Sequence, residues 1–345
     1  MASLSGRPGI VFRSLAEIGG CEGALVRGQR PAKYFGAEEL RFPAKPLYSI
    51  LVNQLHRVAP RALCALRRAG SIPRWLNNVG LQGTSVWAYY EAMRALGFQS
   101  PPTLRIRPGS ACHSLLARLR GSSDMCVFSQ IFAWDEYACL RSIPSPRWIL
   151  DLGANVGYSS AYFLSCFPAA SVIAVEPDPE NYSLCRRNLA PYGKRARVVL
   201  GAAWSCRARL ALRRGSSRVG GEWASQVSPA GGGEASVEAY DIPRLLEMTG
   251  GRRFDILKAD IERSELELFG HNAEHWLDAV GNLCIELHGA DCAKIFFGAL
   301  RGYDYALRRS GELTVCLNLR RRQRRDLGAA NGPDVPPTAA MRSIA

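Results

Sequence analysis

From Trp148 onward the chain alternates between short apolar runs and segments with apolar residues at helical spacing. The apolar runs lack the regular polar positions of a one-sided strand, which is typical of parallel strands buried on both faces. The predicted core strands are residues 148–152, 171–175, 197–203, 254–259 and 282–287. The predicted helices are residues 158–167, 179–190, 241–248, 264–269 and 291–300. Two last runs, 303–307 and 313–319, predict an antiparallel pair, so the pattern indicates an α/β, doubly wound sheet that closes with a hairpin.

The pattern is weaker before this region. Residues 1–45 are rich in Gly and Arg with few periodic apolar positions, and we expect them to be disordered. Residues 46–122 predict a helical extension and lead-in, and residues 123–319 the main domain. Residues 320–345 predict a basic, disordered tail. The apolar face expected on the last helix of the extension consists of Val86, Trp87, Tyr90, Met93 and Leu96.

A glycine-bearing bend follows the first core strand. Gly153 and Gly157 lack a Cβ, so this turn can adopt unusual dihedral angles and a ligand can approach its backbone. Glu176 ends the next strand about 20 residues later, where an acidic side chain commonly binds a ribose diol. The bend lacks the close Gly-x-Gly pair of a pyrophosphate site, and a ribose ligand without phosphate, S-adenosylmethionine, suits it better. The alternative is a tight strand–helix turn without a ligand.

Four ordered motifs resemble the FkbM-type S-adenosylmethionine-dependent methyltransferases. They are D-L-G-A-N-V-G-Y (151–158), A-V-E-P-D-P-E-N (174–181), K-A-D-I-E-R-S-E (258–265) and I-E-L-H (285–288). The likeness extends over about residues 104–318 and implies a class I, Rossmann-like methyltransferase fold with S-adenosylmethionine as cofactor. The expected cofactor-binding residues are Asp151, Gly153, Ala154, Asn155, Gly157, Tyr158, Glu176, Pro177, Ala203, Asp260, Glu136 and Tyr137. Asp151 is expected near the amino-acid tail, Ala203 near the adenine, and Glu136 and Tyr137 at the methionine end.

Further polar side chains follow the fourth and fifth predicted strands. Asp260, Glu262, Glu286 and His288 should meet at the carboxyl edge of the sheet, and we take them as the catalytic residues. His288 is the first candidate for a general base, since an imidazole titrates near neutral pH. The same four residues could instead hold a divalent cation, or the carboxylates could bind Lys258 structurally. We assign no metal.

One position departs from the family pattern. The family usually has Gly-Ala where this chain has Arg263-Ser264. Arginine does not adopt a glycine-type backbone conformation cheaply. Either this turn needs no such conformation, or the substrate side of the site is remodelled.

The composition of the chain indicates its cellular environment and the class of partner that it binds. No run reaches the roughly 18 apolar residues of a membrane span, and the 11 cysteines form no C-x-x-C pair, so we expect a soluble, cytoplasmic protein with reduced thiols. The formal net charge is +14, with much of the excess before residue 100 and in residues 320–325. These basic runs lack interleaved aromatic residues and a known RNA-binding motif, which argues against a nucleic-acid partner.

The resemblance implies O-methylation of a hydroxyl on a small molecule, a sugar or a secondary metabolite. Two alternatives remain open. The positive charge motivates an RNA methyltransferase. The Arg263-Ser264 departure motivates a catalytically silent cofactor-binding or scaffold protein.

Overall fold

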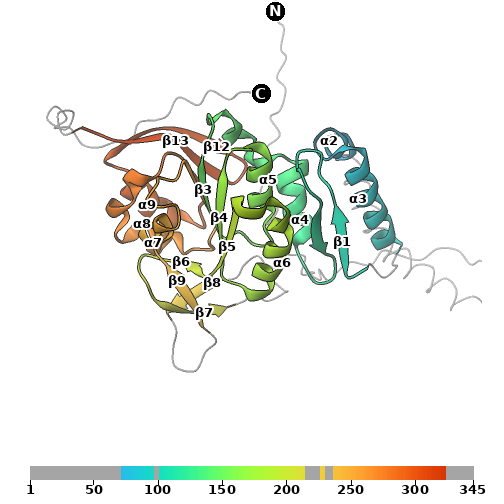
Figure 1. The fold of residues 1–345 in the computed structure, drawn as a ribbon, viewed down its shortest axis with the longest axis horizontal. Coiled ribbons are helices and arrows are strands. Elements are labelled where there is room, and N and C mark those ends of the chain that lie inside the picture. The colour runs from blue at the N-terminus through green and yellow to red at the C-terminus, as the bar shows by residue number, and fades with distance from the viewer. Residues whose placement is uncertain (1–70, 97–100, 214–225, 230–235, 324–345) are drawn as a thin grey trace, which may run out of the picture. The chain divides into compact units, whose positions relative to one another are not determined.

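A mixed, mostly parallel sheet forms the centre of the computed structural model, which describes residues 71–96, 101–213, 226–229 and 236–323 (Figure 1). All of these residues belong to one compact unit. In the described part of the chain this sheet has seven strands in the order β12-β13-β11-β10-β3-β4-β5. The strands are β3 (Trp148–Leu152), β4 (Ser171–Glu176), β5 (Ala196–Leu200), β10 (Ile256–Ala259), β11 (Leu283–Glu286), β12 (Tyr303–Ser310) and β13 (Leu313–Arg321).

The strand order identifies the fold. β3 pairs in parallel with β4 on one side and with β10 on the other, so the order reverses at β3. β13 pairs antiparallel with both β11 and β12. The predicted doubly wound sheet with its closing hairpin is therefore confirmed, and this is the class I methyltransferase arrangement.

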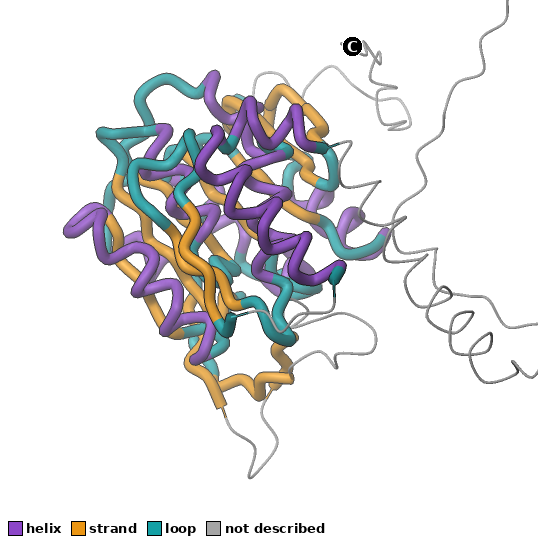
Figure 2. The backbone as a smooth tube through the Cα atoms, turned by 90° about the vertical axis from the view of Figure 1, so that its right-hand side faces the viewer, coloured by secondary structure: helices purple, strands orange, loops and turns teal. Residues whose placement is uncertain are grey.

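Helices cover both faces of the sheet, as the view in Figure 2 shows. Alternate strand residues point to opposite faces, so Ile149 packs in one core with α5 and α6, and Leu150 packs in another with α7, α8 and α9. These helices are α5 (Tyr158–Cys166), α6 (Pro179–Leu189), α7 (Ile242–Glu247), α8 (Glu265–Gly270) and α9 (Ala290–Ala299). Short 3-10 turns are η4 (Ala190–Arg195), η5 (Ala273–His275) and η6 (Leu277–Ala279). None of the helices in the described ranges has the length and apolar character needed to cross a lipid bilayer.

The strand predicted over residues 197–203 is divided in two. The strand is interrupted at Gly201, where an added Cβ would lie 2.5 Å from the ring of Tyr240. β5 ends at Leu200, and β6 (Ala202–Ala203) turns away to pair with β9 (Ser236–Tyr240). β9 also pairs with β7 (Arg209–Arg213), which pairs with β8 (Gln226–Pro229).

Among the described residues, a helix pair, a hairpin and a further helical segment precede the sheet. They are α2 (Ile72–Asn78), α3 (Gly80–Ala95), β1 (Thr103–Ile106) and β2 (Leu115–Arg118), followed by α4 (Asp124–Phe128), the π-helical η2 (Ser129–Ala133) and the 3-10 helix η3 (Glu136–Ser142). On α3, Trp87 and Tyr90 are buried as predicted, and Trp87 stacks on Trp75 of α2 with ring centroids 4.6 Å apart. Leu96, the last residue of the predicted apolar face, follows the end of α3 at Ala95 and is 72% exposed, so it does not extend the buried face.

The hydrophobic core is continuous across the boundary predicted at residue 122. Ile106 and Leu115 of the hairpin share one buried cluster with Phe163 of α5. β13 continues past residue 319 to Arg321, whose guanidinium pairs with Asp278 at 2.9 Å. The predicted disorder of residues 1–45, the helices expected within 46–70 and the tail beyond 323 lie outside the described residues.

Candidate functional site

The bend after β3 lies directly on the end of β4. The amides of Gly153 and Ala154 both donate to the carbonyl oxygen of Val175 at 3.0 Å. Gly153, Asn155 and Gly157 have φ angles of +73°, +49° and +87°, so three positions of the bend use the left-handed region. This conformation brings the bend and the carboxyl end of the neighbouring strand together.

Both glycines are required by internal packing. A Cβ on Gly153 would lie 1.8 Å from the carbonyl oxygen of Asp260, and one on Gly157 would lie 3.0 Å from the sulfur of Cys185. Gly153 therefore lets the end of β10 approach the bend. The tight-turn interpretation accounts for the glycines themselves, and the ligand interpretation has to rest on the polar groups around them.

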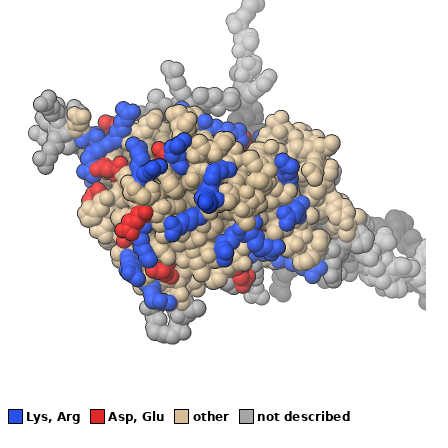
Figure 3. Space-filling model, in the orientation of Figure 1, with Lys and Arg blue, Asp and Glu red and all other residues tan. Residues whose placement is uncertain are grey.

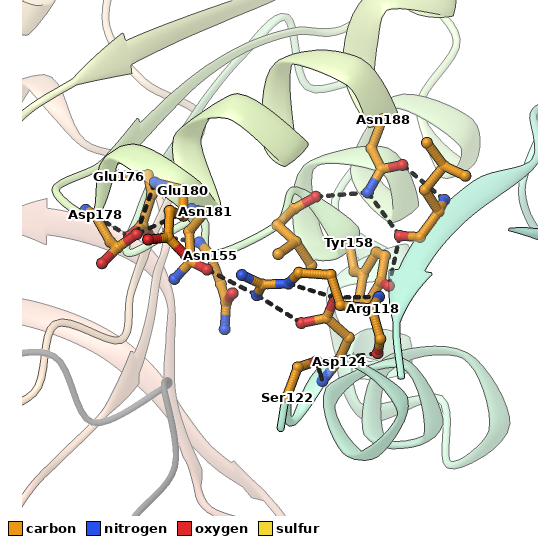
Figure 4. A network of polar contacts seen from close by, with 12 residues as sticks. Arg118, Ser122, Asp124, Asn155, Tyr158, Glu176, Asp178, Glu180, Asn181 and Asn188 are labelled. Carbon is orange, nitrogen blue, oxygen red and sulfur yellow. Dashed lines mark hydrogen bonds and ion pairs between the residues drawn. The ribbon is translucent and has the colours of Figure 1, made fainter. Parts of the chain in front are cut away.

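The most relevant of these polar groups is the carboxylate of Glu176, which lies beside the bend (Figure 4). Its carboxylate accepts the amide of Asn155 at 2.8 Å through Oε2 and the amide of Asp178 at 2.9 Å through Oε1. The side chain is only 4% exposed, and burial raises its pKa to about 7 although the two amides oppose the shift. A carboxylate has roughly four acceptor positions, so Glu176 retains capacity for a ribose diol beside the bend. The residues present therefore fit an adenosine ligand at this point.

Asp151 is committed to the interior. Its Oδ2 accepts the hydroxyls of Ser159 and Ser160, each at 2.6 Å, and its Oδ1 lies 3.3 Å from the ammonium of Lys258. Lys258 also donates to the carbonyl oxygen of Gly153 at 2.9 Å. Burial opposes the charge on Lys258, but Asp151 and Asp260 outweigh it and raise the pKa of the ammonium. Asp151 thus stabilises the bend through Lys258, and its carboxylate is not aimed at a ligand tail as the sequence predicted.

The four predicted catalytic residues converge beyond β10 and β11. The Nε2 atom of His288 lies 3.7 Å from a carboxylate oxygen of each of three residues: Asp260, Glu262 and Glu286. On its other side, Nδ1 of His288 lies 3.0 Å from Oε1 of Glu265, which is fully buried. Sequence reasoning missed Glu265. Two local signals could have indicated it: Glu265 ends the motif of residues 258–265, and it lies three residues after Glu262, on the first turn of α8.

The cluster holds protons at neutral pH. Burial opposes the charge on His288, but Glu265, Asp260 and Glu262 outweigh it and raise the imidazole pKa to about 9. Burial raises the pKa of Glu262 to about 7 and that of Glu286 to about 8, in each case with Asp260 adding to the shift and His288 opposing it. His288 is therefore an imidazolium at neutral pH, which does not suit the general-base role predicted for it.

A ligand atom from each of Asp260, Glu286 and His288 lies within 4.8 Å of the others. Carboxylates and an imidazole are suitable ligands for a divalent cation. Burial and the charge of Asp260, which raise the pKa values of Glu262 and Glu286, also favour protons at these carboxylates. We therefore assign no metal to this cluster.

The remaining predicted cofactor residues divide into two groups. Burial, with the charge of Asp260, raises the pKa of Glu136 to about 7, so this carboxylate lies within the field of the cluster. Tyr137 packs instead against Tyr162 and Phe163, and the Tyr158 hydroxyl donates to the carbonyl oxygen of Leu116 at 2.8 Å. Both rings are buried in the core, and the Tyr137 hydroxyl also lies in the field of Glu136, Asp151 and Asp260, so its contact with a ligand stays a prediction. The three small residues Ala154, Pro177 and Ala203 adjoin the bend or the end of β4, with Ala154 and Ala203 buried and Pro177 half-buried.

The turn that departs from the family pattern does adopt the glycine-type conformation. Glu262 and Arg263 have φ angles of +49° and +76°. The Arg263 guanidinium donates to the carbonyl oxygen of His288 at 3.0 Å and pairs with Asp291. The first of the two explanations for the departure, that the turn needs no such conformation, was therefore wrong.

Comparison with known proteins agrees with this arrangement. A family model described as "Methyltransferase FkbM domain" matches residues 151–305. "Methyltransferase sdnD" of Sordaria araneosa is 29% identical over 191 residues, which cover 46% of this chain and 73% of that protein. "Methyltransferase 1" of Beauveria bassiana (strain ARSEF 2860) is 27% identical over 194 residues, covering 47% and 72%.

Solved structures are more distant. TrmK of M. capricolum in complex with S-adenosyl-homocysteine has a TM-score of 0.32 and 9% identity, covering 55% of this chain and 69% of that chain. At that TM-score the likeness supports no conclusion, and the strand order carries the fold. The matched family model spans the bend, Glu176 and the acidic cluster. We conclude that residues 151–305 match the methyltransferase FkbM domain and that this part of the chain is similar to methyltransferases of that family.

Proposed function

We propose that this protein binds S-adenosylmethionine and methylates a hydroxyl group of a small molecule, a sugar or a secondary metabolite. The contact between Asn155 and Glu176 is the observation that supports this most directly, because it joins the bend to a buried carboxylate at the carboxyl edge of the sheet. Ligands of open α/β sheets bind at that edge, near the reversal in strand order. The acidic cluster around His288 follows the two strands on the other side of β3.

Each group has a defined part in this proposal. S-adenosylmethionine, when bound, supplies a methyl group on a positively charged sulfur. Glu176 accepts the ribose hydroxyls, and the negative charge of Asp260 favours a cationic ligand at the next strand end. Glu262 is the candidate to accept the proton of the acceptor hydroxyl, because it lies in the cluster, 3.7 Å from Nε2 of His288, and a base with a pKa of about 7 is matched to neutral pH. His288, as an imidazolium, keeps a compensating positive charge among the carboxylates.

The cofactor half is tested by isothermal titration of the full chain with S-adenosylmethionine and S-adenosylhomocysteine. We expect Glu176→Gln to weaken binding by roughly 1.5–3 kcal/mol, the range for a hydrogen bond to a charged group. Glu247→Gln is a matched control, since Glu247 is an exposed residue at the end of α7. Equal affinities of the Glu176 variant and the unchanged protein would mean that the ribose is bound elsewhere.

The transfer half is tested with a labelled methyl donor and a panel of hydroxylated acceptors. Label transfer that is lost in Glu262→Gln supports the proposed activity. Cofactor binding with no transfer to any acceptor supports the silent cofactor-binding alternative instead.

An RNA acceptor is a second candidate. In Figure 3, Lys and Arg side chains are spread over much of the visible face and outnumber Asp and Glu there. A basic face attracts phosphate backbones. Binding of labelled RNA that weakens steeply with salt would favour this candidate, and no binding at low salt would exclude it.

A further inference from the structure

The turn between β10 and α8 holds the predicted active-site histidine from several sides. We propose that Arg263 is a positioning residue, which keeps the loop carrying His288 in place so that Glu265 and the carboxylate cluster can orient the imidazole. The catalytic meaning of this role rests on the proposed function. Its structural part can be measured without any methyl transfer.

Three neighbouring residues of one short turn contact His288 at three different places. Glu262 lies 3.7 Å from Nε2, Glu265 lies 3.0 Å from Nδ1, and Arg263 donates to the main-chain oxygen at 3.0 Å. Glu262 and Glu265 therefore set the ring, whereas Arg263 sets the backbone from which the ring projects. Without this anchor, movement of the loop would carry the His288 imidazole away from Glu262 and Glu265 at the same time.

The backbone of the turn explains how these residues reach a single target. Glu262 and Arg263 both lie in the left-handed region, which side-chain-bearing residues enter at a cost. Such strain persists only where the surrounding contacts compensate for it. Arg263 has such contacts at both ends: its guanidinium bonds the His288 carbonyl and Asp291, and its main-chain oxygen accepts the amide of Leu266 at 3.2 Å.

The guanidinium connects the turn after β10 to the segment that leads from β11 into α9. His288 lies in the loop after β11, and Asp291 lies in the first turn of α9. Nη1 reaches the first and Nη2 the second. Because the two nitrogens form a rigid fork, arginine can hold both partners together, which a lysine ammonium on a flexible stem does less well.

The test uses nuclear magnetic resonance of the full chain. The chosen signal is the Nδ1 proton of His288, which the contact with Glu265 should protect from exchange with water; His288→Gln identifies it among the five histidines of the chain. Exchange is preferred to the imidazole titration midpoint, because removing the Arg263 charge would by itself raise that midpoint. We expect Arg263→Ala to accelerate exchange about fivefold to tenfold, the factor for one ordinary hydrogen bond, and Arg263→Lys to restore part of the protection.

Arg322→Ala is the matched control. Arg322 is 44% exposed and pairs with Asp304, whereas Arg263 is 46% exposed and pairs with Asp291. The Arg322 pair lies at the start of β12, near the amino end of β11, whereas His288 follows the carboxyl end of β11. Its removal should therefore leave the exchange rate of the Nδ1 proton unchanged. If Arg263→Ala does not fold, Asp291→Asn loosens the same guanidinium without changing the turn and should give a smaller acceleration.

Kinetics provide the second measurement. We expect kcat for methyl transfer to fall in the order unchanged protein, Arg263→Lys, Arg263→Ala, with the affinity for S-adenosylmethionine unchanged within about twofold, because only transition-state positioning is lost. Protection of the Nδ1 proton that is equal in the unchanged protein and Arg263→Ala would overturn the inference. Ordered loss of protection in a protein that transfers no methyl group would support the positioning role and reject the proposed activity.

Discussion

At the scale of single residues, the property that decides the chemistry is the location of protons. The three carboxylates facing Nε2 of His288 cannot all be charged in a half-buried site without a compensating cation. The imidazolium supplies one positive charge, and Glu262 and Glu286 retain protons to higher pH than exposed carboxyls do. The cluster therefore exchanges protons between about pH 7 and pH 9.

We expect Glu262→Gln to reduce kcat by about 10²–10⁴-fold, the usual contribution of a general base. The amide keeps the size of the side chain but cannot accept the proton of the acceptor hydroxyl. Binding of S-adenosylmethionine should be unchanged, because the ribose carboxylate is Glu176. Steady-state kinetics with a methyl acceptor, and calorimetry beside it, measure the two effects. A variant that keeps full kcat would place the base elsewhere.

Stability should depend on pH through His288. Its pKa is raised from 6.5 to about 9 in the folded protein, so the native state keeps a proton that the unfolded chain has lost. This stabilisation is complete below pH 6.5 and disappears as the pH rises through 9. Urea denaturation at several pH values should show the free energy of unfolding falling over that interval, and less steeply in His288→Gln. Parallel curves for the two proteins would contradict the raised pKa.

At the scale of elements, two turns with left-handed residues organise the carboxyl edge of the sheet. The bend after β3 lets the carbonyl oxygen of Asp260 approach Gly153, and the turn after β10 brings Glu262 and Glu265 to His288. One turn uses glycine and the other uses residues held by their side-chain contacts. We therefore expect the bend after β3 to tolerate no Cβ at Gly153, whereas the turn after β10 already carries side chains at its left-handed positions.

Gly153→Ala should therefore destabilise the protein by about 3 kcal/mol or more, the range of severe backbone and steric mechanisms. The new Cβ would meet the Asp260 carbonyl oxygen at 1.8 Å, and backbone has little freedom to move. Gly250→Ala is the control, since Gly250 also has a positive φ, +74°, close to the +73° of Gly153, but nothing lies within 4 Å of its added Cβ. It should cost only about 1–2 kcal/mol. Urea unfolding measures both, and equal costs would show that the close approach is unimportant.

At the scale of the whole molecule, the hairpin β1–β2 is joined to the methyltransferase core by a polar network (Figure 4). Asn188 of α6 accepts the amide of Leu116 at 2.8 Å and donates to the carbonyl oxygens of Leu116 and Val156 at 3.1 and 2.9 Å. Arg118 pairs with Asp124 at 2.8 Å and donates to Asn181 at the same distance. The segment before the sheet is thus bonded to the helices that follow the bend.

Asn188→Ala should destabilise the protein by about 2–4 kcal/mol, because it leaves buried backbone groups without their hydrogen bonds. The loss should be largest at β2. Hydrogen exchange of residues 115–118 should accelerate more than that of β3. Asn77→Ala is the control, as Asn77 is exposed and bonds only its neighbour Asn78 among the described residues. Uniform acceleration across both strands would instead indicate global destabilisation without a specific role of this network.

The order of strands and helices was predictable, because burial on both faces leaves a continuous apolar run at each core strand. The meeting of the bend with Glu176 was predictable for a similar reason, since adjacent parallel strands end at the same edge. The division at Gly201 was not, because the ring of Tyr240, distant in sequence, causes it. Nor were the internal roles of Asp151, Tyr137 and Tyr158, whose contacts come from helices and strands that packing brings together.

By itself, the sequence determined the sheet, its closing hairpin, the bend and the set of polar residues at the carboxyl edge, because each depends on periodicity or spacing within a few neighbouring elements. Only the tertiary structure decided the charge of His288, the part played by Glu265 and the left-handed turn at Arg263. Protonation depends on distance and burial, and the groups that set both for His288 come from β10, α8 and β11. Contacts between such separate elements leave no local pattern along the chain.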